Sequence, residues 1–185
     1  MGVRSDRAAA TRRKLIDAAR NEFQMHGFAG GRVDAIAEQA GVNKRLIYAH
    51  FGSKVGLFSE VLADNVARVS QAVPFTPDDL PGYAVSLFDY WTLEPTAVRL
   101  FSWRNLEVDA APQFEDETYR GMIQQIEESG ASERASIPAP HILALLFAVL
   151  LAWAIPADAF QRADANELAT RRESISLAVR RILRA

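Results

Sequence analysis

The stretch from Val33 to Lys54 reads VDAIAEQAGVNKRLIYAHFGSK and decides the fold of the first third of the chain. Apolar residues at helical spacing predict a short helix over 32–40 and a second one over 44–50. Gly41 breaks the first of these helices, and Asn43 is a favourable N-cap for the second. So short a turn sets the two helices at roughly 90–120° to each other.

A longer helix is expected before this stretch, over residues 6–26. Leu15, Ala19 and Phe23 recur at intervals of four residues and form one apolar stripe. Gly27 follows the last apolar residue and is placed to end the helix. We therefore predict a unit of three helices that share a small core.

The second short helix carries its polar residues on the side opposite Ile47 and Phe51. Arginine and lysine donate hydrogen bonds to guanine O6 and N7, and an alanine contacts the methyl group of thymine. Lysine and tyrosine also contact phosphates, which position a protein without reading sequence. The pattern predicts a recognition helix for the major groove of DNA, which would use Asn43, Lys44, Arg45, Tyr48 and Ala49.

Charge is distributed unevenly along the chain. Residues 1–56 hold 10 Lys and Arg against 5 Asp and Glu, whereas residues 57–185 hold 11 against 18. The net charge is therefore +5 in the first part and −7 in the second. Chance clustering of solvated charge is one explanation, but together with the turn glycine, the cap and the tyrosine the asymmetry favours a polyanion bound at one end.

The first 60 residues or so resemble the DNA-binding domain of regulators of the tetracycline-repressor type, the TetR family. The resemblance is carried by Gly27-Phe28, Val33, Ile36-Ala37, Ala40-Gly41-Val42-Asn43-Lys44, Ile47-Tyr48, His50-Phe51 and Ser53-Lys54. It implies DNA contacts by Lys44, Arg45, Tyr48 and His50 and a phosphate contact by Lys54. Gly30-Gly31 replaces the usual Thr or Ser cap of the second helix, and Arg32 is expected to supply the phosphate contact of that position.

The remaining chain is expected to be helical, with no strand-type alternation. We predict an all-α fold of about nine helices and two domains: a DNA-binding domain over 1–56, and a domain for ligand binding and dimerisation over 57–185. A linking helix over 53–71, capped by Ser53, connects them. Further helices are expected over 81–93, 95–109, 112–130, 139–156 and 165–184.

Two C-terminal helices carry an excess of apolar residues. The run from Ile142 to Ile155 has no charged residue, and the last helix has a single apolar seam. These helices can form the chain's own core or half of an intermolecular four-helix bundle. The family resemblance implies the second arrangement and a homodimer, with interface residues Leu150, Ile175, Val179 and Ile182.

The middle of the chain is rich in aromatic residues. The resemblance implies a pocket there for a small effector, which we expect to be apolar or aromatic. Taken singly, each candidate is better explained without a ligand: a tryptophan on a helix is more often plain core, and His141 is more often a helix-start residue. The candidate ligand-binding residues are Trp91, Trp103, Arg104 and His141.

Several classes of function are disfavoured by composition. Cysteine is absent, and His26, His50 and His141 lie far apart, so we expect no metal and no cofactor. No nucleophile motif points to an enzyme, and the run over 142–155 is shorter than the roughly 20 residues of a spanning helix. We expect a cytoplasmic repressor that binds a near-palindromic operator in double-stranded DNA. The alternatives are a DNA-binding protein without a ligand, a helical scaffold and a membrane-associated adaptor.

Overall fold

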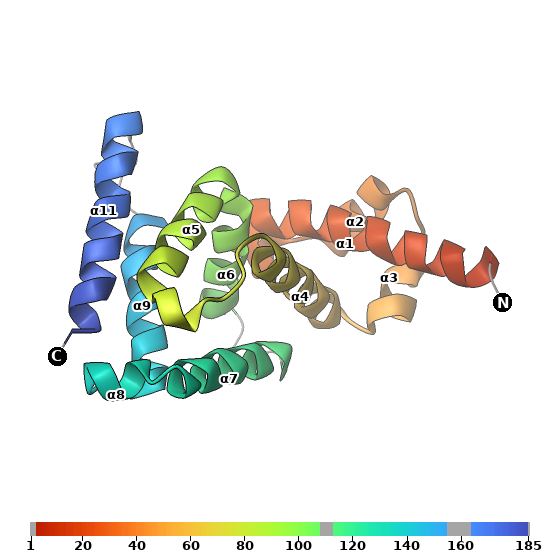
Figure 1. Cartoon of the computed structure of the whole chain (residues 1–185). Helices are drawn as coiled ribbons and strands as arrows, with labels where there is room; N and C mark the ends of the chain where they lie inside the picture. The colour runs from red at the N-terminus through yellow and green to blue at the C-terminus, as the bar shows by residue number, and fades with distance from the viewer. Residues whose placement is uncertain (1–2, 108–112, 155–163, 185) are drawn as a thin grey trace. The chain divides into compact units, whose positions relative to one another are not determined.

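A computed structural model describes residues 3–107, 113–154 and 164–184 and shows only helices within those ranges (Figure 1). The elements in chain order are α1 (Val3–Gly30), α2 (Val33–Ala40), α3 (Arg45–Phe51), α4 (Lys54–Ala72), the 3₁₀ helix η1 (Pro77–Asp79), α5 (Leu80–Leu93), α6 (Pro95–Glu107), α7 (Gln113–Glu128), α8 (Ala131–Ala135), α9 (Ala139–Ala154) and α11 (Ala165–Ile182).

The all-α prediction is confirmed, and the described residues hold ten α-helices where about nine were expected. The additional helix is α8, which spans five residues between two positions with positive φ, Gly130 and Ser136. A single helical turn is too short to show an apolar period, so the sequence pattern did not reveal it. Residues 108–109 and 155–156, predicted to end helices, and residue 112, predicted to start one, lie outside the described residues.

The chain forms two compact units. Unit 1 comprises Met1–Ala67 and Thr96–Pro112, and unit 2 comprises Arg68–Pro95 and Gln113–Ala185. Helix α6 therefore belongs with the N-terminal helices although it follows α5 in the chain. The functional division at residues 56 and 57 stays a prediction.

Unit 1 is built around the apolar stripe of α1. Leu15, Ala19 and Phe23 are all fully buried, as their spacing predicted. The ring of Phe23 meets that of Phe58 from α4 edge to face at 4.9 Å, an arrangement that aromatic pairs prefer. Phe28 lies over Phe58 at 5.1 Å, so the three rings join the end of α1 to α4.

Helix α6 is held against α1 and α4 by contacts at both of its ends. Near its start, the side-chain amide of Asn65 donates to the carbonyl of Ala97 over 3.0 Å. At its end, the Glu107 carboxylate accepts from the backbone N–H of Ala29 over 2.9 Å. Trp103 of α6 packs beside Gly27, where an added Cβ would lie 3.0 Å from its ring.

Gly27 ends the regular part of α1, as predicted, with φ 71° and ψ −178°. This backbone conformation is open almost only to glycine. Replacing Gly27 with alanine is expected to lower the free energy of unfolding by about 2–4 kcal/mol, because strain adds to crowding against Trp103 and Glu107.

Gly41 provides a matched control for this prediction. It has φ 66° and ψ 36°, and nothing lies within 4 Å of an added Cβ. Gly41→Ala should therefore cost only about 1–2 kcal/mol of left-handed strain. Urea unfolding of the two variants measures the difference, and equal losses would contradict the proposed packing of Trp103 on Gly27.

Unit 2 packs α5 against α9 and α11, and α7 against α8 and α9 (Figure 1). An ion pair between Arg172 and Asp89, at 2.6 Å, joins α11 to α5. Burial raises the pKa of Tyr83 on α5 to about 12, which keeps its hydroxyl protonated in the core. Within the described parts of the chain, no helix combines the length and the apolar character that crossing a membrane requires.

The apolar seam of the last helix turns out to belong to this core. Leu150, Ile175 and Val179 are almost completely buried within the single chain, and Ile182 is half-buried. That Leu150, Ile175, Val179 and Ile182 lie at a dimer interface is not tested by a single chain and stays a prediction. The seam pattern indicated burial but could not distinguish the chain's own core from a second copy.

Candidate nucleic-acid interface

The turn between α2 and α3 has the geometry that its sequence predicted. Gly41 adopts the left-handed conformation at the end of α2, and the N–H of Val42 donates to the carbonyl of Ala37 over 3.0 Å. This closure satisfies carbonyl groups at the end of α2. The chain can then turn within a few residues.

Asn43 caps the start of α3, as expected. Its side-chain oxygen accepts from the N–H of Arg45 over 2.9 Å, and its backbone carbonyl accepts from Leu46 over 2.9 Å. Ser53 caps α4 in the same way, because its hydroxyl accepts from the N–H of Gly56 over 3.0 Å. The starts of α3 and α4 are thus both fixed by side-chain hydrogen bonds.

One side of α3 is buried and the opposite side is open to solvent. Ile47 is fully buried, which anchors the helix to the core of unit 1. The predicted contact residues Asn43, Lys44, Arg45, Tyr48 and Ala49 are all exposed. The face is therefore basic and aromatic, and it is available to a ligand.

Leu46 is a member of this face that the sequence analysis missed. Its side chain is 38% exposed, although it is large and apolar. Position 46 lies next to Arg45 and one turn before Ala49, away from Ile47. A helical projection of the seven residues of α3 would have placed it on the open side.

The side chain of Lys44 is held by α2. Its Nζ lies 2.8 Å from Oδ1 of Asp34, in the first turn of α2. The hydrogen bond to this carboxylate raises the pKa of Lys44 above its usual value, so the lysine stays charged. Asp34 is a second residue that the sequence analysis did not single out.

The other predicted contact residues differ in their exposure and in the contacts that they already make. Arg32 is exposed at the N-cap of α2, which has no side-chain cap, and its backbone N–H donates to Glu22 over 2.9 Å. Lys54 donates to the carbonyl of Ala29 over 3.1 Å and lies 4.8 Å above the ring of Phe28. His50 is half-buried and lies beside Phe51.

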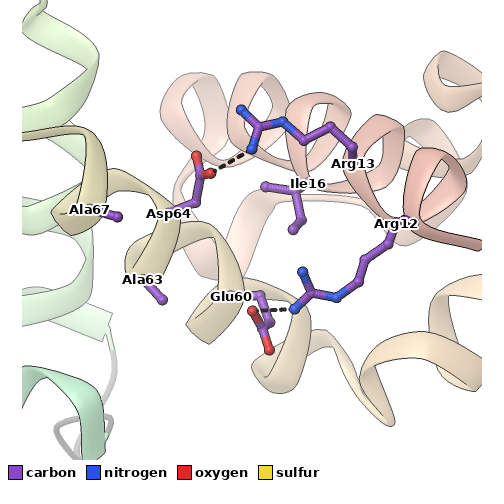
Figure 2. Close-up of a pocket in the computed structure, with 8 residues that line it drawn as sticks. Arg12, Arg13, Ile16, Glu60, Ala63, Asp64 and Ala67 are labelled. Atoms are coloured by element: carbon purple, nitrogen blue, oxygen red, sulfur yellow. Dashed lines mark hydrogen bonds and ion pairs between the residues drawn. The ribbon is translucent and has the colours of Figure 1, made fainter. Parts of the chain in front are cut away.

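A groove of about 360 Å³ lies between α1 and α4 in unit 1, and Figure 2 shows its lining. Ion pairs between Arg12 and Glu60, at 2.5 Å, and between Arg13 and Asp64, at 3.0 Å, cross it. Arg20 also pairs with Asp64. None of the predicted site residues lines this groove, and its arginines are engaged in joining α1 to α4.

The structure assigns the four candidate ligand residues to different units. Trp103 and Arg104 lie on α6 in unit 1, whereas Trp91 and His141 lie in unit 2. Trp91 is half-buried against the core of unit 2, and His141 is exposed in the first turn of α9. In the described residues, no three His, Asp or Glu side chains gather where they could hold a metal ion.

Comparison with known families matches both parts of the chain. Residues 15–61 match the model for bacterial regulatory proteins of the tetR family. Residues 79–181 match the model for a tetracyclin repressor-like C-terminal domain. The two matches together cover most of the helices described above.

Individual relatives give the same result. The HTH-type transcriptional repressor SCO4008 of Streptomyces coelicolor is 36% identical, over 94% of this chain and 95% of the relative. The repressor NicS of Pseudomonas putida is 37% identical over 57% of this chain and 53% of its own length. The crystal structure of the putative regulator SCO4942 from Streptomyces coelicolor superposes with a TM-score of 0.74 at 32% identity, over 92% of this chain and 97% of the other. From these matches and the helical geometry we conclude that the chain belongs to the TetR family of DNA-binding transcriptional regulators.

Proposed function

We propose that this protein represses transcription by placing α3 in the major groove of an operator. The observation that carries the proposal is the capped start of α3, from which an exposed basic and aromatic face projects. The printed names of the relatives SCO4008 and NicS as repressors support the direction of regulation. As a regulator of this kind, the protein would work in the cytoplasm, without a cofactor and without an enzymatic activity.

The residues of the interface divide into two roles. We assign Arg45 to reading a guanine, and Leu46 and Ala49 to contacting thymine methyl groups. Tyr48, Arg32 and Lys54 are assigned to phosphates, which set the position of the protein on the duplex. Lys54 retains N–H groups beyond the one that it donates to Ala29, since an ammonium has three.

Selection of binding sites from a random duplex library tests this function. We expect a near-palindromic site whose half-site centres lie about 34–36 Å apart, or a multiple of that distance. Hydroxyl-radical footprinting should then show two protected patches on one side of the duplex. Recovery of no preferred sequence would contradict regulation through a specific operator and favour the alternative of a helical scaffold.

We further propose that the protein is a homodimer through the outer faces of α9 and α11. Leu145 on α9 and Leu177 on α11 are large, apolar and exposed in the single chain. The exposed side of α9 also carries Ala144, Ala148 and Ala152, small residues that permit close approach of another helix. A face of this kind is typical of an interface, since water solvates it poorly.

Charged substitutions on this face should dissociate the dimer. Leu145→Asp and Leu177→Asp are each expected to shift sedimentation from twice the monomer mass toward the monomer at micromolar concentration, because a buried unpaired carboxylate is costly. Leu93→Asp, on an exposed leucine of α5, is the matched control and should leave the dimer intact. A wild-type protein that sediments as a monomer would overturn the proposed dimer.

We also propose that a small apolar or aromatic effector releases the protein from DNA. Aromatic side chains of unit 2 support this class of ligand: Trp91 is half-buried, and Tyr119 meets Phe147 at 5.9 Å. Because coupling between two ligands is reciprocal, DNA should weaken effector binding by the same factor, roughly 5–150-fold.

Tryptophan fluorescence offers the measurement. A Trp103→Phe variant removes the one of the three tryptophans that lies in unit 1, so the remaining signal comes from Trp91 and Trp153 in unit 2. A compound that quenches this signal should also raise the dissociation constant for operator DNA. If the tightest compound leaves DNA affinity unchanged, the protein is a constitutive DNA-binding regulator instead.

A further inference from the structure

An acidic side chain stands at the edge of the surface assigned to DNA. Asp34 lies in the first turn of α2, and its Oδ1 is 2.8 Å from Nζ of Lys44, the residue just before α3. Both side chains remain largely open to water, at 66% and 46% exposure. The pair therefore lies on the surface of unit 1, beside the start of α3.

Stability does not account for an ion pair in this place. Exposed ion pairs contribute little to the free energy of unfolding, because water screens them and long side chains lose freedom in forming them. The Asp34 carboxylate has a larger effect on DNA binding, and it acts in two ways. A carboxylate beside the phosphate backbone cancels the attraction that Lys44 alone would add, and it holds the lysine ammonium at a fixed point beside the start of α3.

These two effects act differently on the two kinds of DNA. Binding to nonspecific DNA depends almost wholly on phosphate charge and counterion release, so one cancelled charge weakens it directly. In the specific complex, a lysine held near the base edges can donate its remaining N–H groups to guanine O6 or N7. These hydrogen bonds from Lys44 to the base offset its lost attraction to phosphate, but only on the correct sequence.

We propose that Asp34 is a specificity-determining residue of this interface: by pairing with Lys44 it positions the lysine toward base edges and lowers the affinity for nonspecific DNA. The proposal rests on the proposed function of α3 as a recognition helix. Asp34 acts through Lys44 and is in that sense a positioning residue.

The test compares Asp34→Asn with Glu38→Gln in the full chain. Glu38 lies one turn further along α2 and is exposed, so each variant removes one negative charge from the same helix. Dissociation constants are measured for the operator duplex recovered by selection and for a scrambled duplex of equal length, over a range of salt concentrations. Circular dichroism and thermal unfolding establish that both variants remain folded.

Asp34→Asn should tighten binding to the scrambled duplex by roughly three- to tenfold per protomer near 0.1 M salt, and steepen the salt dependence by about one unit. Affinity for the operator should change less, so the ratio of specific to nonspecific affinity should fall by roughly threefold or more. Glu38→Gln should leave this ratio within about twofold, and Asp34→Glu should restore it in part, since a carboxylate is present again.

A double-mutant comparison tests whether Asp34 acts through Lys44. In a Lys44→Met background, Asp34→Asn should no longer lower the specificity ratio, because the side chain that it positions is gone. An unchanged ratio in Asp34→Asn, or an equal fall in Asp34→Asn and Glu38→Gln, would overturn the proposal while leaving DNA binding by α3 intact. A wild-type protein that binds neither duplex would overturn the proposed function and this inference together.

Discussion

Arg45→Ala is expected to weaken binding to the selected operator by about 1–3 kcal/mol, which is roughly a 5- to 150-fold rise in the dissociation constant. Arg45 is exposed in the first turn of α3, where its own backbone N–H is fixed by the cap from Asn43. Its guanidinium is thus carried on a rigid element and can donate two hydrogen bonds to one guanine. Fluorescence anisotropy with a labelled duplex gives the dissociation constant.

The effect should depend on sequence. Replacing the contacted guanine should cost the wild-type protein about as much as the substitution does, and it should cost the Arg45→Ala variant little. Arg99→Ala removes an exposed arginine from α6 and serves as the control for lost charge. If Arg45→Ala and Arg99→Ala weaken binding equally on all sequences, Arg45 does not read a base.

Phe58→Ala should have the largest effect on stability, about 3–5 kcal/mol in the free energy of unfolding. The ring is 1% exposed and contacts both Phe23 and Phe28, so its removal leaves a cavity where α1 meets α4. Because α3 is anchored to the same unit, operator binding should be lost over the temperature range in which the variant unfolds. Urea unfolding followed by circular dichroism measures the loss.

Val55→Ala is the control for this change. Val55 lies on the same helix and is largely exposed, so its truncation should alter stability by about 0.5 kcal/mol or less. A loss below about 1 kcal/mol for Phe58→Ala would mean that the three phenylalanine rings do not hold unit 1 together.

The sequence predicted the α1–α3 region well because its signals are local. The left-handed turn after α2 favours a glycine, which is Gly41, and the Asn43 cap accepts from an N–H only two residues away. The four-residue spacing from Leu15 to Phe23 forms a buried stripe on any helix. Each of these features depends on residues close in the chain. Such patterns can be read without knowing which distant segment packs against them.

Features that depend on distant partners were not predictable in the same way. The place of Trp103 and Arg104 in unit 1 was not predictable, because it depends on the contacts of α6 with Gln24, Ala29 and Asn65. Their role in ligand binding stays a prediction. The periodic seam of α11 predicted burial, but it did not say that α5 and α9 of the same chain cover it. The pairing of Asp34 with Lys44 likewise depends on how α2 and α3 cross.

The central claim is that the exposed face of α3 binds DNA, and the salt dependence of binding tests it most directly. The logarithm of the wild-type binding constant for the selected duplex should fall linearly with the logarithm of the salt concentration. The slope should be about −0.9 for each phosphate neutralised. A variant with Arg45→Ala and Tyr48→Ala together should lose specific affinity while its unfolding remains unchanged, and its salt slope should change little because neither residue is assigned to neutralise a phosphate. Binding that is independent of salt, or that survives both substitutions undiminished, would contradict the account.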